Sequence, residues 1–267
     1  MNKESRLQEA YLSRLEKQRR KIMAARILLA LAFFLLWETA ADRGWIDSFF
    51  FSSPSRLGRL FLSMWRDGSL FLHVGITLTE TLVSFALVVV IGLAVSLLLW
   101  LSDSVFQVLE PYLVILNSLP KSALAPLLIV WLGANSRTII VAGMSVAIFG
   151  TILNLYTGFT ETSREKIRLI YTLHGTKKDA LTKVVLPSTV PMIISIMKVN
   201  IGLCLVGVVI GEFIGARNGL GYLIIYGSQV LQLDLVILSI LILCLMAMLL
   251  YGGVTVAEKL YHRRQHA

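Results

Sequence analysis

Residues 81–101 read TLVSFALVVVIGLAVSLLLWL and hold no charged side chain. A helix needs roughly 20 apolar residues to cross the hydrocarbon core of a bilayer, and this stretch has that length. The rest of the chain shares its character, because 56% of the 267 residues are hydrophobic and only 15% are charged. Soluble globular domains carry about 25% charged residues. The composition therefore argues against a water-soluble enzyme and for a membrane protein.

Five further apolar runs have the length of a membrane span. Residues 138–159 and 235–257 contain no charge, whereas residues 24–41, 112–132 and 192–210 are interrupted by charged residues or prolines. The sequence therefore predicts an all-α, polytopic membrane protein with six transmembrane helices. Its expected parts are a basic cytoplasmic N-terminal helix at residues 1–23, a six-helix transmembrane domain at residues 24–257 and a cytoplasmic tail at residues 258–267.

The basic residues indicate how these spans are oriented. Lys and Arg outnumber Asp and Glu by 25 to 16, and they gather in residues 1–26, 160–191 and 258–267. With six spans these three segments share one side of the membrane, and cytoplasmic segments carry the excess of Lys and Arg. Both termini are therefore predicted to be cytoplasmic. The same topology accounts for the net charge of +9, so no nucleic-acid partner is expected.

The N-terminal segment leaves two interpretations open. Leu7, Tyr11 and Leu15 recur at helical spacing, so residues 4–22 are either a basic amphipathic helix on the inner leaflet or a solvated helix. We interpret residues 24–41 as an uncleaved first span rather than a secretory signal.

The connection between the first two spans, residues 42–80, is expected on the outer side of the membrane. Its apolar residues recur at helical spacing over residues 57–64. This pattern predicts an interfacial helix with Ser55 at its N-cap.

The connection at residues 160–191 is charged, yet it carries an apolar face. A charged segment with an apolar face favours docking to a protein partner. Its end, Leu186-Pro187 followed by Pro191, is expected to finish one helix and start the next at a new angle. The apolar face consists of Ile167, Ile170, Tyr171, Leu173, Ala180, Leu181, Val184 and Val185.

Three stretches resemble permease subunits of bacterial ABC importers, specifically the nitrate/sulfonate/taurine-type group. They are ALTKVVLPSTVP at residues 180–191, SLPKSALAPLLIVWLG at residues 118–133, and GVVIGEFIG with GLGYLI at residues 207–215 and 219–224. Leu36-Trp37-Glu38 and Ser53-Pro54-Ser55 also fit, so the similarity covers about residues 28–257. The resemblance implies the type I importer permease fold and a bacterial inner-membrane location.

In this family the cytoplasmic loop forms a short coupling helix in a groove of a separate ATPase subunit. Closure of two ATPase subunits on ATP then moves two permease subunits and alternates access. The resemblance places the coupling helix at residues 171–178, with Leu173, Ala180 and Leu181 as packing contacts and with Arg168, Lys177, Lys178 and Asp179 as a polar rim. The full expected coupling set is Arg168, Tyr171, Leu173, His174, Gly175, Thr176, Lys177, Asp179, Ala180, Leu181, Leu186 and Pro187.

One part of the loop departs from the family pattern. The family's Glu-Ala-Ala and glycine positions are occupied here by Arg168-Leu169-Ile170 and by His174. A turn that needs glycine can still form one residue later, at Gly175.

The chain lacks a Gly-x4-Gly-Lys-Ser/Thr phosphate loop. We therefore expect this chain to be no enzyme and to bind no cofactor, with ATP and Mg²⁺ held by the partner ATPase. The other partners that the resemblance implies are a second permease copy, two ATP-binding subunits, an extracytoplasmic solute-binding protein and the lipid bilayer.

Polar and glycine residues inside the spans are candidates for the translocation path or gate. Lys121 either attracts an anionic substrate or has a structural role, and Lys198 is expected to reach the inner interface by snorkelling. The glycines at 207, 211, 215 and 219 serve either packing and gating or substrate contact. The candidates are Asn117, Pro120, Lys121, Lys198, Asn200, Gly211 and Glu212.

The remaining polar residues in the spans have plainer interpretations. Asn117, Asn154 and Asn200 are expected to hydrogen-bond between helices, and Cys204 and Cys244 to behave as small core residues.

Two other function classes serve as alternatives. A secondary transporter driven by an ion gradient would need acidic sites inside the spans, which are scarce, and a membrane enzyme would need a cluster of His, Asp or Ser. The solute stays open among sulfonates, taurine, nitrate and vitamin-precursor-like heterocycles.

Overall fold

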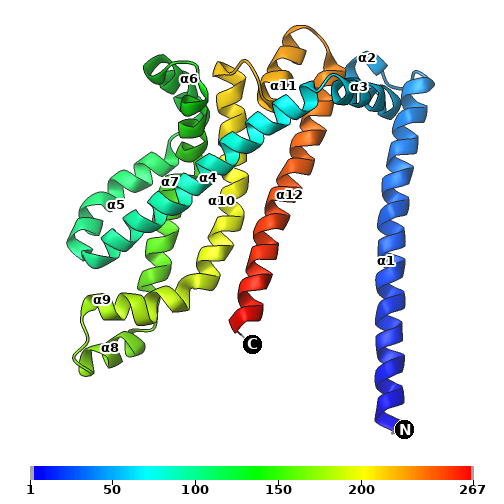
Figure 1. Ribbon diagram of the computed structural model, residues 1–267. Helices are drawn as coiled ribbons and strands as arrows, with labels where there is room; N and C mark the ends of the chain where they lie inside the picture. Colours follow the sequence, from blue (N-terminus) through cyan, green and yellow to red (C-terminus); the bar gives the residue numbers. More distant parts are fainter. Residues whose placement is uncertain (1–2, 266–267) are drawn as a thin grey trace. The chain divides into compact units, whose positions relative to one another are not determined.

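The computed structural model describes the backbone of residues 3–265 and the side chains of residues 18–261. Every regular element in this part is helical, which confirms the predicted all-α class (Figure 1). The helices are α1 (Lys3–Asp42), α2 (Ser48–Phe51), α3 (Pro54–Arg66), α4 (Ser69–Leu101), α5 (Asp103–Ser118), α6 (Lys121–Leu132), α7 (Ser136–Thr160), α8 (Arg164–Thr172), α9 (Lys177–Ala180), a π-helical turn (Leu181–Val185), α10 (Leu186–Gly215), α11 (Leu220–Gln229) and α12 (Leu233–Gln265).

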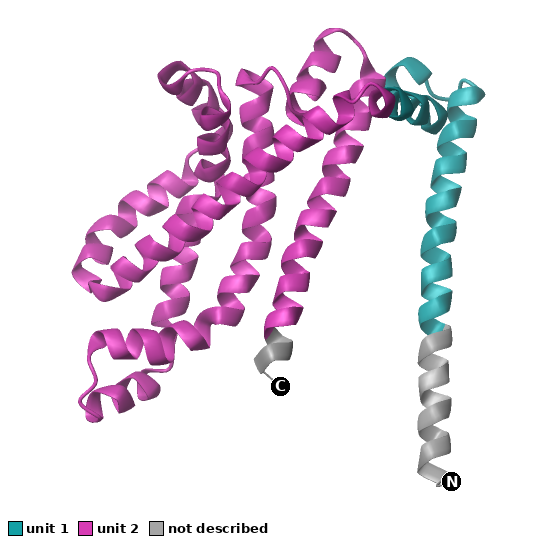
Figure 2. Cartoon of the chain, viewed as in Figure 1, with its two compact units in different colours: residues 1–63 teal, residues 64–267 magenta. Residues whose placement is uncertain are grey.

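The chain divides into two compact units, residues 1–63 and residues 64–267 (Figure 2). In the first unit, α1 is a single helix, so the basic segment at residues 4–22 continues into the first span without a break. The side chains that were predicted to face the inner leaflet, Leu7, Tyr11 and Leu15, lie outside the described side chains.

Two of the family-like motifs meet inside the first unit. The indole Nε1 of Trp37 donates to the carbonyl oxygen of Phe51 at 3.2 Å, and the amide of Ser55 donates to the Glu38 carboxylate at 2.9 Å. The predicted interfacial helix exists as α3, but Ser55 does not cap it. Ser53 precedes the helix and its hydroxyl accepts from the amide of Arg56 at 3.4 Å, as an N-cap residue does.

The second unit is built around α7, which packs against both α4 and α10. The α7–α10 contact needs residues without side chains. A Cβ on Gly207 would lie 2.8 Å from the Cα of Gly143 and 2.9 Å from the carbonyl oxygen of Ala142. Small residues allow membrane helices to approach closely in this way. Gly207 therefore serves helix packing, and the series is helical through Gly215, one glycine further than predicted.

α4 begins twelve residues before the predicted second span. Asp67 supplies the start signal, because its carboxylate accepts from the amide of Ser69 at 2.9 Å and from the hydroxyl of Ser69 at 2.6 Å. These hydrogen bonds hold the pKa of Asp67 below its usual value. At 1.5 Å per residue, the 33 residues of α4 span about 50 Å. The connection that was predicted at residues 42–80 is therefore much shorter.

The predicted third span, residues 112–132, is not one helix. Five described helices are long and apolar enough to cross a membrane, and a sixth span exists only if the pair α5 and α6, bent by 95°, is taken as one. The residues between the predicted second and third spans, 102–111, belong to α5 and its preceding turn. Pro120 causes the bend, because the residue before a proline is pushed out of the helical region. Leu119 has the extended angles φ −61° and ψ 138°.

The prolines after the charged segment do not end a helix. The chain is helical from α9 through α10. The π-helical turn before Pro187 accommodates this proline, so the helix is not interrupted there. There the amide of Leu186 donates to Leu181, five residues back. π-Helical turns are an established cause of helix bending, and Figure 1 shows α9 meeting α10 at a wide angle. The predicted change of direction is confirmed, whereas the predicted helix end is wrong.

Candidate functional site

The α8–α9 segment lies at one end of the second unit (Figure 1). α8 ends in a Schellman motif: the amide of His174 donates to Tyr171 at 3.0 Å, and the amide of Gly175 donates to Ile170 at 2.9 Å. His174 has φ 61°, so it takes the left-handed conformation that glycine usually provides. The expectation that Gly175 would make this turn is wrong, because the hydrogen bonds place the left-handed residue at 174.

Gly175 is required for a different reason, because there is no room for a side chain at this position. A Cβ there would lie 2.5 Å from Cγ2 of Ile170 and 2.9 Å from its carbonyl oxygen. The coupling helix predicted at residues 171–178 is therefore not one helix. Its first two residues finish α8, residues 173–176 form the turn, and the next two begin α9.

The start of α9 is held by a capping box. The hydroxyl of Thr176 accepts from the amide of Asp179 at 3.3 Å, and the Asp179 carboxylate accepts from the amide of Thr176 at 2.9 Å. Lys183 pairs with the same carboxylate at 3.0 Å. This arrangement satisfies donors that a helix start leaves free. Asp179 therefore shapes the segment, and its side chain stays 34% exposed, so its role in a polar rim toward a partner stays a prediction.

Burial divides the predicted coupling residues into two groups. Ala180, Leu181 and Val185 lie with Leu155 and Phe159 in a core of this chain. The expectation that Ala180 and Leu181 contact a partner is wrong, because Ala180 is fully buried and Leu181 is buried against its own chain.

The exposed apolar group lies at the end of α8 and in the turn that follows it. Leu173 is 71% exposed, Leu169 59% and Tyr171 45%. We call these three residues the apolar tip. Leu169 was not in the predicted contact set, although it stands at the middle position of the family's Glu-Ala-Ala motif.

Lys177 anchors α9 to the turn between α4 and α5. Its ammonium donates to the carbonyl oxygen of Leu101 at 3.1 Å, lies 4.0 Å from the carboxylate of Asp103 and sits 5.4 Å from the ring centroid of Trp100. Lys177 is thus bound within its own chain. Arg168, Lys178 and His174 stay exposed around the apolar tip, while Leu186 and Pro187 begin α10.

The other end of the second unit holds a buried polar cluster where α4, α10 and α11 meet. Glu212 is fully buried, and its carboxylate accepts from the hydroxyl of Thr77 and from the amide of Gly221, both at 2.6 Å. Thr77 accepts from the amide of Leu220 at 2.8 Å, and Nδ1 of His73 accepts from the amide of Gly219 at 3.0 Å. The first amides of α11, which a helix leaves unpaired, are therefore bound by α4 and α10.

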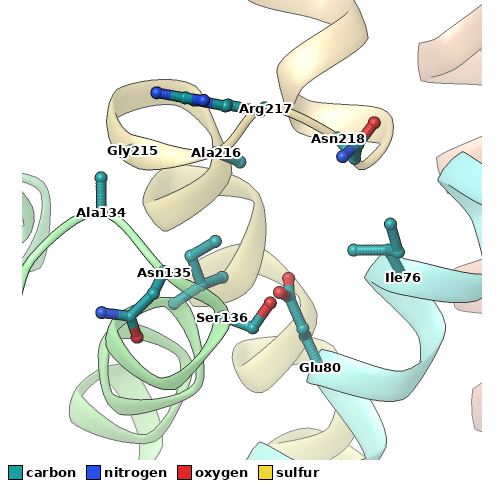
Figure 3. A pocket seen from close by; sticks show the side chains of 10 residues that line it. Ile76, Glu80, Ala134, Asn135, Ser136, Gly215, Ala216, Arg217 and Asn218 are labelled. Carbon is teal, nitrogen blue, oxygen red and sulfur yellow. The ribbon is translucent and has the colours of Figure 1, made fainter.

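Glu80 lies beside this cluster. It is 3% exposed, and its buried carboxyl group interacts with the side chains of Ser136 and Glu212, although neither contact has the geometry of a good hydrogen bond. It lines a pocket of about 190 Å³ together with Asn135, Ser136 and residues 215–218. Figure 3 shows the Glu80 carboxylate pointing into the space between α4, the start of α7 and the α10–α11 turn.

The two lysines of the predicted path are held by their own chain. Lys121 donates to the carbonyl oxygen of Leu116 across the α5–α6 bend, and its ammonium lies 5.3 Å from the ring centroid of Phe149. It satisfies a carbonyl that the end of α5 leaves free. Lys198 forms an ion pair with Glu258 of α12, and its snorkelling to the inner interface stays a prediction.

The other path candidates are scattered. Gly211 and Glu212 are buried in α10, Asn200 is buried with its Nδ2 unpaired, and Pro120 and Asn117 are exposed. Asn117 and Asn154 make no side-chain hydrogen bond within the described side chains, so the predicted interhelical bonds are not formed there.

The cysteines also differ from each other. Cys204 is buried as predicted, but Cys244 is exposed on α12, so the predicted core role of Cys244 is wrong.

Sequence reasoning missed His73, Thr77 and Glu80 because they fell inside the predicted outer connection. A signal was present. Residues 73, 77, 80, 81 and 84 are polar and recur at i, i+4, i+7, i+8 and i+11, which is one face of a helix, and all five are buried in α4. Glu80 and Glu212 also show that acidic residues inside the spans are less scarce than expected.

Comparisons with known proteins agree with this fold. Residues 88–265 match the family model described as "Binding-protein-dependent transport system inner membrane component". The probable ABC transporter permease protein of Haemophilus influenzae is 30% identical over 89% of this chain and 95% of its own length.

Two further relatives carry solute names. The formylaminopyrimidine transport permease ThiX of Halalkalibacterium halodurans is 28% identical over 73% of this chain and 77% of its own length. The taurine transport permease TauC of Escherichia coli is 24% identical over 84% and 83%.

Among solved structures, the inward-facing MetNI methionine ABC transporter aligns with a TM-score of 0.59 at 20% identity, covering 68% of this chain and 91% of the matched chain. This likeness shows the fold. The relatives are permease subunits and not enzymes. The chain is therefore a multi-pass membrane protein of the binding-protein-dependent ABC importer permease family, of the nitrate/sulfonate/taurine type.

Proposed function

We propose that this chain forms the translocation path of an importer for a small solute and that the apolar tip docks on a separate ATPase subunit. The observation that carries the proposal is the contrast in burial within α8 and α9. Leu169, Tyr171 and Leu173 are exposed, whereas Ala180, Leu181 and Val185 lock the same segment into the core. The apolar tip is exposed at its surface and fixed to the core at its base. It can therefore transmit a displacement, caused by a partner, to α10.

The contacts of α9 define the route by which such a displacement travels. α9 continues through the π-helical turn into α10, and Lys177 ties α9 to the α4–α5 turn. A displacement of the tip therefore reaches α4 and α10 together. Both helices also hold the polar cluster around Glu212 at the far end.

The proposed assembly contains two copies of this permease, two ATP-binding subunits and an extracytoplasmic solute-binding protein. ATP and Mg²⁺ belong to the ATP-binding subunits. Both termini and the α8–α9 end face the cytoplasm of a bacterial cell, because residues 1–26, 160–191 and 258–267 hold most of the Lys and Arg. The α11 end then faces the binding protein.

The solute proposed here is a sulfonate, taurine or nitrate-like anion or a vitamin-precursor-like heterocycle. TauC supports the first class and ThiX the second. An ion-gradient-driven transporter would run without the ATPase partner, so the following experiment also separates these two functions.

The test replaces Leu173 by Asp. A buried charge without a partner is costly, so we expect solute-stimulated ATP hydrolysis of the reconstituted importer to fall at least tenfold, while the variant still inserts into membranes. Ser163→Asp is the matched control, because it adds the same charge to the same segment at the N-cap of α8, where Asp is favoured. Normal coupling in Leu173→Asp would remove the basis for this docking site.

A further inference from the structure

Two carboxyl groups, Glu80 of α4 and Glu212 of α10, lie together in the buried cluster at the α11 end. Glu80 is 3% exposed and Glu212 is fully buried, and their side chains interact with each other. A buried carboxylate is costly unless a cation or hydrogen-bond donors compensate it, and two neighbouring carboxylates repel each other. The pair therefore needs either a positive charge or a proton.

No cationic side chain within residues 18–261 supplies this charge, since the ion pairs of that part of the chain involve neither Glu80 nor Glu212. Arg217 lines the pocket beside Glu80, but it is exposed and pairs with neither carboxyl group. His73 accepts from the amide of Gly219 through Nδ1 at 3.0 Å. This nitrogen therefore carries no proton, and the imidazole is neutral.

The helix ends beside Glu80 do not replace a cation either. The start of α7 has partial positive charge, but the amides of Arg137 and Thr138 already donate to the side chain of Asn135, at 3.0 Å and 3.2 Å. The Arg137 side chain is exposed. The pocket also contains the end of α10 at Gly215, where a helix has partial negative charge. These surroundings favour a neutral Glu80 over a charged one.

The hydrogen bonds distinguish the two acids. Glu212 accepts from the hydroxyl of Thr77 and from the amide of Gly221, both at 2.6 Å, and short bonds of this kind stabilise a carboxylate. Glu80 receives no well-formed hydrogen bond, so its negative charge would lack such support. The geometry therefore favours a negative charge on Glu212 and a proton on Glu80.

We propose that Glu80 and Glu212 bind one proton between them, carried by Glu80, and that this proton holds α4 against α10. Without it, two like charges share one buried site and push the two helices apart. A movement that separates α4 from α10 exposes Glu80 to water. Its O–H bond then breaks, the electron pair stays on the carboxylate, and the proton passes to water in the pocket of about 190 Å³ that Glu80 lines. Opening of this end is thus coupled to the release of one proton.

Infrared spectroscopy of the purified full-length permease tests where the proton lies. The protein is placed in nanodiscs of ether-linked lipids, which have no ester carbonyl groups, because a protonated carboxyl group has its own C=O stretching band. We expect this band in the wild type at neutral pH. The difference spectrum between the wild type and Glu80→Gln isolates its loss, since Glu212 keeps its two donors and stays ionised. Glu212→Gln keeps the band, and Glu110→Gln, at an exposed carboxylate, is the control and matches the wild type.

Hydrogen exchange tests whether opening releases the proton. If one proton leaves on opening, the protection factors of the amides of residues 219–221 fall by up to about tenfold per pH unit between about pH 6 and about pH 8, above the range in which an exposed glutamate titrates. A protection factor is relative to the intrinsic exchange rate, so the chemical effect of pH is removed. We expect Glu80→Gln to lose this pH dependence. The amides of residues 173–176, at the other end of the unit, are the internal control and show none.

A wild-type spectrum without the band would overturn the proposal, and so would a band that persists in Glu80→Gln or an equal pH dependence of exchange in that variant. If Glu80→Gln does not fold, the wild type and Glu212→Gln still decide, because loss of the band in Glu212→Gln would assign the proton to Glu212 instead. Both measurements use the permease without an ATPase, so their failure leaves the coupling function untouched.

Discussion

The two ends of the second unit stabilise their turns in opposite ways. At the α8–α9 end the hydrogen bonds that form the turn are local, because the Schellman motif and the capping box join residues that are three to five positions apart; Lys177 adds one distant bond, to Leu101. At the α11 end the amides of residues 219–221 are bound by side chains of α4 and α10, up to 146 positions away. The first end is a preformed tip with exposed apolar residues, and the second exists only when three helices have assembled.

This difference has a consequence for function. A locally stabilised tip keeps its shape while it moves, which suits a surface that meets a partner. A turn held by distant side chains changes whenever α4 and α10 move relative to each other, which suits a gate. Three substitutions test this contrast between the two ends.

Glu212→Ala should have the largest effect. It removes the acceptor for both Thr77 and the amide of Gly221 in a fully buried site, and each buried donor left unpaired costs about 1–3 kcal/mol. We expect a loss of about 3–5 kcal/mol in unfolding free energy, measured by denaturant unfolding in detergent. Glu110→Ala, at an exposed carboxylate, should change it little. A loss below 1 kcal/mol in Glu212→Ala would mean that α11 does not depend on this cap.

Gly175→Ala should have an intermediate and local effect. The added Cβ would meet the carbonyl oxygen of Ile170 at 2.9 Å, and overpacking of this kind costs about 1–3 kcal/mol. We expect the amides of residues 173–176 to exchange their hydrogens about ten- to a hundredfold faster, while the α11 amides keep their protection. Faster exchange at both ends would contradict the independence of the two turns.

His174→Gly should have the smallest effect, and it should stabilise. The side chain of His174 costs about 1 kcal/mol in the left-handed conformation, and glycine removes this cost but adds freedom to the unfolded chain. We expect slower exchange of the same amides by about twofold to fivefold. His174→Ala is the control, since it keeps the left-handed cost and should leave the exchange rate close to that of the wild type. Faster exchange in His174→Gly would show that the imidazole itself holds the turn.

Much of the fold could be predicted from the chain's apolar runs. The helices α7, α10 and α12 cover the predicted spans, because few polar residues interrupt them and the one lysine among these, Lys198, pairs with Glu258. The third span was misjudged because Pro120 acts on its neighbour Leu119, a local effect that hydropathy does not register. The start of α4 was misjudged because its first turns are polar and therefore resemble a loop.

The candidate sites were predicted less completely. The segment at residues 160–191 was singled out by its charge and apolar face, and its docking role stays a prediction. Periodicity cannot distinguish an apolar residue that is buried in its own core from one that stays exposed: Ala180 and Leu181 are buried, whereas Leu169 is exposed. Glu80 was missed altogether, since its importance comes from Glu212, which is 132 positions away.

The sequence by itself determined that the chain crosses a membrane, that it is all-α, which segments are basic and which family it resembles. These properties depend on composition and on residues close together in the chain, where hydropathy and helical periodicity act. Only the packing of the helices showed which apolar residues stay exposed, that Lys198 pairs with Glu258, and that two carboxyl groups lie in one buried site. Those outcomes depend on which helices face each other, such as α7 with α4 and α10, and α10 with α12.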